Sequence, residues 1–182
     1  SASVVASVMM VVPVITTAVN FHMTTVGHFN ALKWSPTLRF TVFGAVCYTL
    51  ASGQGSTMAI PSLNVITHFT HYTIGHSHLG MYAFFTMVMY GAIYYIMPRV
   101  VGWEWPSSRL IRWHFWLVAI GIVFMVIVLS VGGVLQGLAL LNPNVTFMKS
   151  LEIARPWLWM RSGSGILLTA GHIVFAVNFT LL

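Results

Sequence analysis

The sequence contains no aspartate, and its only acidic residues are Glu104 and Glu152. Charged residues of both signs make up 5% of its 182 positions, whereas soluble domains carry about 25%. A single cysteine, Cys47, excludes a disulfide framework within the chain. Hydrophobic residues make up 58% of the chain and the mean hydropathy is +0.86. These values exclude an ordinary soluble domain and predict an integral membrane protein.

The formal charge of +6 comes from eight lysines and arginines. In a membrane-embedded chain such an excess reports orientation and contact with lipid headgroups, so we expect membrane lipid as a partner and no nucleic acid. The basic residues fall into two groups of connecting segments, with Lys149, Arg155 and Arg161 in the smaller group. The larger group, expected on the cytoplasmic side, contains Lys33, Arg39, Arg99, Arg109 and Arg112.

Five apolar runs are long enough to cross a bilayer, which takes about 20 residues. Because a backbone in lipid must satisfy its own hydrogen bonds, runs of this length are expected to be helices. The chain begins and ends inside such runs, without an initiating methionine or a basic leader, so we expect it to be part of a longer polypeptide. The sequence predicts an all-α membrane protein in which 1–182 is one helical region with spans at 2–26, 39–60, 72–97, 113–140 and 157–182.

The third run carries two histidines separated by one residue, His76 and His78. On a helix these side chains project about 200° apart, so they do not bind one metal ion together. Opposite faces suit two cofactors, each taking one imidazole as an axial ligand, and haem is the flat cofactor held in this way. Gly75 and Gly80 flank the pair and permit close approach. Two alternatives are a packing or polar-network role and a proton transporter whose histidines relay protons without haem.

The other intramembrane polar residues have simpler interpretations. His114 lies beside aromatic residues at the expected cytoplasmic start of its span, which is typical of an interfacial aromatic belt. His22, His28 and His172 lie near the expected helix ends. Gln54 is different, because a carboxamide in the bilayer interior needs hydrogen-bonding partners.

The stretch THFTHYTIGHSHLG, which contains the histidine pair, resembles the tenth helix of the catalytic subunit of cbb-type (C-family) haem-copper cytochrome c oxidases. Further matching segments follow in the family's order: SPTLRF, AIPSLN, YYIMPR, HFW, VLQGL and FMKSLE. The resemblance covers essentially the whole chain. It corresponds to the C-terminal part of that subunit, about the last five helices of a twelve-helix bundle.

The resemblance implies roles for individual residues. His76 is the expected axial ligand of the high-spin haem, where oxygen is reduced, and His78 an axial ligand of the low-spin haem. His68 and Arg161 are expected to contact haem propionates, and an arginine fork pairs well with carboxylates. The implied cofactors are two b-type haems, with copper bound by residues outside this segment.

The resemblance also implies the whole protein's function. It would be a multi-pass protein of the bacterial inner membrane, part of a respiratory terminal oxidase that reduces oxygen to water with electrons from cytochrome c and takes up protons. Its expected partners are cytochrome c-type subunits or soluble cytochrome c, and the remainder of the catalytic subunit. Tyr48, with the hydroxyls of Thr49, Ser52 and Ser56, is a possible proton path.

Two positions depart from the family's pattern. Gln54 stands where cbb-type oxidases carry a glutamate that hydrogen-bonds the proximal histidine, and His71 stands where the family usually has aspartate. A neutral amide draws the imidazole toward imidazolate less strongly than a carboxylate does, so we expect a higher potential at that haem or tuning for a different diatomic gas. Nitric oxide reductases, which share the scaffold and histidine pattern, are therefore one alternative. A haem-carrying electron-transfer subunit without catalysis is another.

Overall fold

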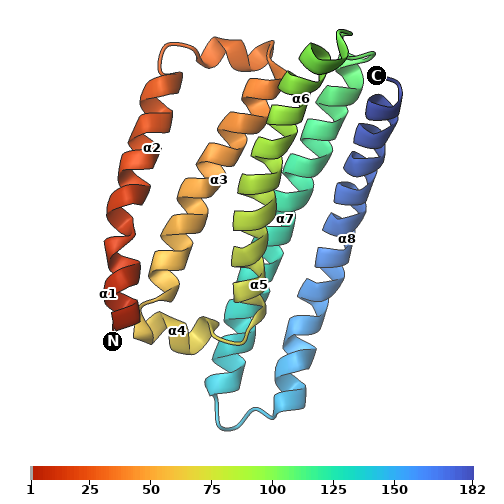
Figure 1. Ribbon diagram of the computed structural model, residues 1–182. Coiled ribbons are helices and arrows are strands. Elements are labelled where there is room, and N and C mark those ends of the chain that lie inside the picture. The colour runs from red at the N-terminus through yellow and green to blue at the C-terminus, as the bar shows by residue number, and fades with distance from the viewer. Residues whose placement is uncertain (1) are drawn as a thin grey trace.

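The computed structural model describes residues 2–182, which are helical for most of their length (Figure 1). Two further elements are not α-helices: η1 is a short 3₁₀-helix and η2 is a π-helix. In chain order the elements are α1 (Ala2–Met9), α2 (Val11–Thr25), η1 (Phe29–Lys33), α3 (Pro36–Met58), α4 (Pro61–Thr67), α5 (His71–His78), η2 (Leu79–Thr86), α6 (Met87–Val101), α7 (Ser108–Leu141) and α8 (Phe147–Thr180).

Hydroxyl side chains begin the three longest helices. Ser35, Ser107 and Thr146 each accept a hydrogen bond from the backbone N–H three residues further on, at 3.2, 3.3 and 3.3 Å. Each cap satisfies a donor that has no partner inside its helix. At the end of α6, Gly102 takes a left-handed conformation with φ of 80° and ends the helix.

Four helical segments of the described residues are long and apolar enough to cross a membrane, at Val4–Thr25, His71–Val101, Ser108–Leu141 and Phe147–Thr180. The predicted all-helical membrane class is therefore confirmed, but the predicted count of five spans is not. The exception is α3, whose 23 residues are long enough but whose serines, threonines and glutamine make it less apolar than the other four.

Several prolines lie within helices, among them Pro98 in α6 and Pro156 in α8. The sequence placed Pro156 in a connection ahead of a span at 157–182, whereas α8 starts at Phe147 and runs through this residue. A proline removes one backbone hydrogen bond, which a long helix tolerates when its neighbours hold it in place. Pro13 likewise offers no N–H to Met9, and the boundary between α1 and α2 falls nearby at Met10.

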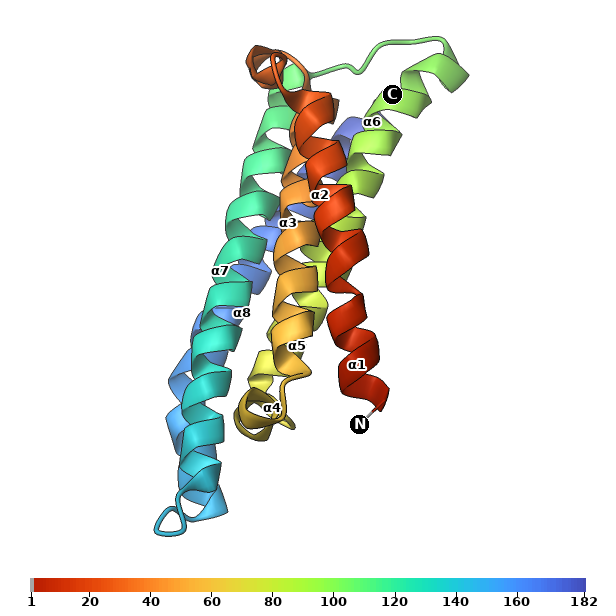
Figure 2. The ribbon, with the colours of Figure 1, turned by 90° about the vertical axis from the view of Figure 1, so that its left-hand side faces the viewer.

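The long helices lie side by side and run alternately up and down (Figures 1 and 2). One end of the bundle holds the α2–α3 and α6–α7 connections, and the opposite end holds α4 and the α7–α8 turn. α7 and α8 form an antiparallel pair, while α3 packs against α2, η2 and α6. The α1–α2 segment lies at the edge, where Val14 is its buried side chain.

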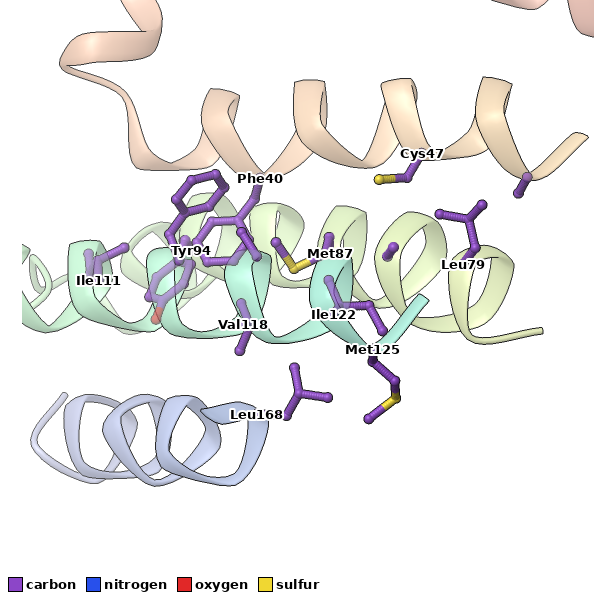
Figure 3. Packing of buried hydrophobic residues seen from close by; sticks show 14 of the residues in the cluster. Phe40, Cys47, Leu79, Met87, Tyr94, Ile111, Val118, Ile122, Met125 and Leu168 are labelled. Atoms are coloured by element: carbon purple, nitrogen blue, oxygen red, sulfur yellow. The ribbon is translucent and has the colours of Figure 1, made fainter. Parts of the chain in front are cut away.

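Buried apolar side chains fill the space between α3, η2, α6, α7 and α8 (Figure 3). Phe40, Met87, Val118, Ile122 and Leu129 are fully buried. Because lipid is as apolar as these side chains, their close packing stabilises the bundle mainly through van der Waals contact.

Two glycines let α7 approach the segment that leads into the histidine pair. A Cβ at Gly133 would collide with the backbone nitrogen of Tyr72, and one at Gly137 would collide with the Ile66 carbonyl oxygen. Because backbone atoms at both positions leave no room for a side chain, only glycine fits at either one. Backbone contact with α7 thereby fixes the height and tilt of α5.

Candidate functional site

The two histidines of the HSH motif end α5, and a π-helix follows at once. Thr70 caps the start of α5 by accepting from the Tyr72 N–H at 3.3 Å. Within η2 the Thr86 hydroxyl donates to the Met81 carbonyl, five residues back, at 2.9 Å. π-helical turns are rare and occur often at functional sites. No motif or spacing in the sequence predicted this one.

His76 faces α3. A Cβ on Gly55 of α3 would lie 3.2 Å from Cε1 and 3.5 Å from Nε2 of the His76 ring, so the glycine leaves room for the imidazole. The ring borders a cavity of about 340 Å³, whose other lining residues include Tyr48, Ser52, Ser56, Gly80 and Phe84. Nδ1 of His76 is buried and has no hydrogen-bond partner among the described residues.

Gln54 precedes Gly55 on α3 and has one weak partner. Its Nε2 donates to the Ser130 hydroxyl of α7 at 3.5 Å, while its Oε1 is buried without a partner among residues 2–182. A buried acceptor on α3 and a buried ring nitrogen on α5 are thus both without a partner among the described residues. Such groups are rare in native proteins and call for a partner. The two atoms are not hydrogen-bonded to each other in this structure.

His78 is oriented by its own helix. Its Nδ1 lies 2.8 Å from the Ile74 carbonyl oxygen, and because a carbonyl only accepts, Nδ1 carries the proton and Nε2 keeps a free lone pair. Histidines that bind metals usually donate their other N–H to a carbonyl or carboxylate in this way. His78 does not line the cavity beside His76.

The remaining predicted site residues lie in different surroundings. Tyr48 lines the His76 cavity and packs its ring against Phe84, with centroids 5.0 Å apart. His68 is exposed in the α4–α5 connection, where its ring lies 3.9 Å from that of Phe69. Arg161 is exposed on α8. The structure therefore brings Tyr48 and His76 to one cavity, while the Gln54 side chain meets Ser130 of α7 instead. His68 and Arg161 lie outside this cavity.

His71 joins the start of α5 to α7. Its backbone N–H donates to Gln136 Oε1 at 3.1 Å, and its ring Nδ1 lies 2.6 Å from the same oxygen. Gln136 comes from the VLQGL segment and is buried. These contacts give His71 a structural role that its sequence position left open.

A second cluster of histidines and tyrosines, which the sequence interpretation missed, lies between η2, α6, α7 and α8. Tyr82 and Tyr90 bracket His172 of α8, with their hydroxyls 3.1 Å from Nε2 and 2.9 Å from Nδ1. The Tyr94 hydroxyl lies 2.8 Å from Nδ1 of His114. These five residues are called the phenol–imidazole cluster below.

His114 was predicted to belong to an interfacial aromatic belt, but it is fully buried. The rings of Phe40, Tyr90 and Phe175 surround it, with centroids 5.2, 4.4 and 5.1 Å away. His172 was placed near a helix end but lies within α8. The sequence held one indication of this cluster: Tyr82, Tyr90 and Tyr94 are spaced by eight and four residues and so share a helix face. Their partners on other helices were not visible in sequence.

No three His, Cys, Asp or Glu side chains gather as a metal site within residues 2–182. The HSH pair provides two separate imidazoles on one helix of the bundle.

The fold and the HSH helix define a helical membrane protein with two histidines, one residue apart, inside a candidate span. The family model described as Cytochrome C and Quinol oxidase polypeptide I matches residues 1–167. The chain belongs to this family.

Several curated proteins are similar to the chain in sequence. It is 36% identical over 185 residues to the Cbb3-type cytochrome c oxidase subunit CcoN1 of Stutzerimonas stutzeri, covering 98% of this chain and 39% of the relative. It is 31% identical to the Cytochrome c oxidase subunit 1 homolog of Agrobacterium tumefaciens, covering 96% of this chain and 34% of the relative. It is 29% identical to a nitric oxide reductase polypeptide of Stutzerimonas stutzeri, covering 64% and 26%. The chain thus spans about a third of the length of these relatives.

Among solved structures, a cryo-EM structure of a heme-copper terminal oxidase dimer aligns with a TM-score of 0.65 at 19% identity, covering 86% of this chain and 29% of that chain. At this identity the likeness establishes the fold alone.

Proposed function

We propose that this chain forms part of the catalytic subunit of a bacterial respiratory terminal oxidase, which reduces oxygen to water with electrons from cytochrome c. The main observation that supports this proposal is the HSH helix, where His76 borders a cavity and His78 has its Nε2 lone pair free. The 36% identity to a cbb3-type cytochrome c oxidase subunit supports the assignment. This relationship supports the proposed gas substrate, electron donor and partner subunits.

The residues present fit haem. His78 donates Nδ1–H to the Ile74 carbonyl, which leaves Nε2 as a ligand. Gly55 leaves space at the His76 ring, and Nδ1 of His76 and Oε1 of Gln54 are both buried without partners among residues 2–182. Haem iron, when bound, supplies electron transfer at His78 and gas binding at His76, with two b-type haems expected. Copper would be held by residues outside this segment.

The chain's own residues then orient and tune the site. The Ile74 carbonyl fixes the tautomer of His78. Gln54 offers the neutral Oε1 as acceptor for His76 Nδ1–H, a weaker electron push than a carboxylate gives. Tyr48 brings a hydroxyl to the His76 cavity and is proposed as a proton donor there. Thr49 and Ser56 donate to carbonyls of their own helix at 3.2 and 3.0 Å.

The membrane arrangement is part of the proposal. α3 would cross the bilayer as a fifth span despite its polar side chains, since it lies between α2 and α6 (Figure 1). These spans would belong to a twelve-helix bundle in the bacterial inner membrane, with the α2–α3 and α6–α7 connections on the cytoplasmic side. His68 and Arg161 would contact haem propionates at the other end.

Metal content of the purified intact complex tests the assignment. About one copper per catalytic subunit, with all iron accounted for by haem, is the result expected of an oxygen reductase. The transporter alternative requires a colourless complex without haem, and that result would overturn the proposal. A companion variant, Tyr48→Phe, is expected to lower oxygen consumption and proton uptake together, and unchanged values would remove Tyr48 from the proton path.

Nitric oxide reduction is a second candidate, because Gln54 provides no carboxylate beside His76 and a nitric oxide reductase polypeptide is 29% identical over 64% of the chain. It requires one iron beyond the haem iron and no copper. Turnover assays with oxygen and with nitric oxide on the same preparation separate the two reactions.

A further inference from the structure

We infer that the phenol–imidazole cluster is a proton-transfer route that enters from the α6–α7 end of the bundle and leads toward the HSH helix. The inference rests on the proposed function, since it adds a path to the haem-ligating helix. It concerns Tyr94, His114, Tyr90, His172 and Tyr82, and it is separate from the path proposed through Tyr48.

The entrance is a cavity of about 900 Å³ at the end of the bundle. Glu104, one of the chain's two acidic residues, lines it together with Arg99, Tyr94 and the hydroxyl of Ser108. Trp105 closes over Tyr94 by donating Nε1–H to its backbone carbonyl at 2.9 Å. Tyr94 thus lines a polar cavity on one side and contacts His114 on the other.

From Tyr94 the first step enters a fully buried position. The Tyr94 hydroxyl lies 2.8 Å from His114 Nδ1, and His114 Nε2 is buried with no partner among residues 2–182. A buried polar ring with one nitrogen unpaired is unfavourable by roughly 1–3 kcal/mol. A packing role alone does not require an imidazole at this position, whereas a carrier that accepts a proton on one nitrogen and releases it from the other does.

The second step crosses from His114 to Tyr90. Their rings meet edge to face with centroids 4.4 Å apart, and the unpartnered Nε2 of His114 is the nitrogen from which the route releases a proton toward the Tyr90 oxygen. The route then follows existing contacts, in which the Tyr90 hydroxyl lies 2.9 Å from His172 Nδ1 and the Tyr82 hydroxyl 3.1 Å from Nε2. In the tautomer with the proton on Nε2, Tyr90 donates to Nδ1 and Nε2–H donates to the Tyr82 oxygen. Tyr90 accepts a proton from His114 as it gives its own to His172 Nδ1, and Tyr82 passes on its hydroxyl proton as it accepts the one from Nε2, so no net charge stays on His172 or on either phenol.

The route spans more than half of the membrane and ends near the HSH motif. Tyr82 and Tyr94 are twelve residues apart, which is about 18 Å along a helix, more than half of the roughly 30 Å hydrocarbon core. Tyr82 follows His78 by four residues, within about one helical turn. A change of charge at a group held by His78 would therefore meet a proton delivered to the same level of the membrane.

Ring N–H exchange provides a test that does not need turnover. In the intact complex labelled with ¹⁵N-histidine, exchange of His114 and His172 with D₂O would be followed by NMR. Tyr94→Phe should slow exchange at both histidines by about tenfold or more, at the low end of what positioned proton-transfer groups contribute. Tyr90→Phe should slow His172 alone, because it cuts the route beyond His114. Tyr95→Phe keeps the aromatic ring that lines the same cavity and removes only a hydroxyl outside the Tyr94–His114 contact, so it should change neither.

Unchanged exchange at His172 in Tyr94→Phe would overturn the route, and so would equal slowing of His114 and His172 in Tyr90→Phe. If Tyr94→Phe prevents assembly, His114→Gln cuts the same step and is read at His172. Loss of haem from the unmodified complex would overturn the proposed function but leave the exchange result interpretable. With haem present, proton uptake on chemical reduction should fall in Tyr94→Phe and stay unchanged in Tyr95→Phe.

Discussion

The molecule holds histidines in two regions that differ in how their ring nitrogens are satisfied. At the HSH helix, His78 keeps a free Nε2 and His76 has an unpartnered Nδ1 beside a cavity. In the phenol–imidazole cluster, His172 has both nitrogens bonded to tyrosine hydroxyls, and His114 has one nitrogen bonded to a tyrosine and one unpartnered among the described residues. Open nitrogens suit ligation, whereas nitrogens paired with phenols suit proton exchange. The same side chain, histidine, is therefore suited to ligation in one region and to proton exchange in the other, according to its surroundings in the bundle.

The largest expected difference between the two histidine regions is in haem binding. His76→Ala should remove one haem and lower turnover by more than about 100-fold, because loss of an axial ligand exceeds the 10–100-fold effect of removing a supporting group. His172→Ala should keep the full haem complement, since its nitrogens face tyrosines. The pyridine haemochrome assay on both purified complexes measures this difference. Loss of haem in His172→Ala would show that the two regions are not separate.

The backbone contacts that position the HSH helix give the next largest effect. Gly137→Ala forces a Cβ against the Ile66 carbonyl and should destabilise the complex by about 3 kcal/mol, as overpacking does. Gly163→Ala on α8 meets nothing within 4 Å and serves as the matched control. Denaturation in a graded series of SDS concentrations would compare them. Equal stability of the two variants would mean that α7 does not hold the α4–α5 segment.

The phenol–imidazole cluster should respond more mildly to loss of one hydroxyl. Tyr94→Phe leaves His114 with no partner on either nitrogen, an effect of about 1–3 kcal/mol on the free energy of unfolding. Tyr95→Phe, on the exposed side of α6, should change it by less than about 0.5 kcal/mol. The same SDS titration distinguishes them, and a fall in stability with Tyr95→Phe alone would contradict the assignment of Tyr94 as the buried partner.

Much of the fold was readable from the sequence, because long apolar runs in a chain with two acidic residues have few other solutions. The HSH motif was readable too, since its spacing sets the angle between two side chains on one helix. α3 shows where prediction from composition stops. Its hydroxyl side chains and Gln54 make it less apolar than the other spans, so composition alone does not identify it as a fifth membrane span. The positions of His114 and His172 were not predictable, because their tyrosine partners lie 20, 82 and 90 residues away.

Gln54 offers the finest test of the comparison, through the potential of a haem held by His76. Gln54→Glu would place a carboxylate next to Gly55, which borders the His76 ring, and a negative charge there should stabilise oxidised iron bound by that imidazole. The midpoint potential of that haem should fall by on the order of 60 mV, the equivalent of a tenfold change in a one-electron equilibrium.

A haem held by His78, as proposed, would act as an internal control in the same optical redox titration, because the Gln54 side chain meets Ser130 instead of His78. Gln136→Glu, whose side chain meets His71 instead, should leave the potential of the His76 haem nearly unchanged. An equal fall in both potentials in Gln54→Glu would mean that the new charge acts through the bulk field of the bundle. A fall confined to one haem would show that the Gln54 amide sets the electronic character of His76, which is the property that separates the open histidines from those paired with tyrosines.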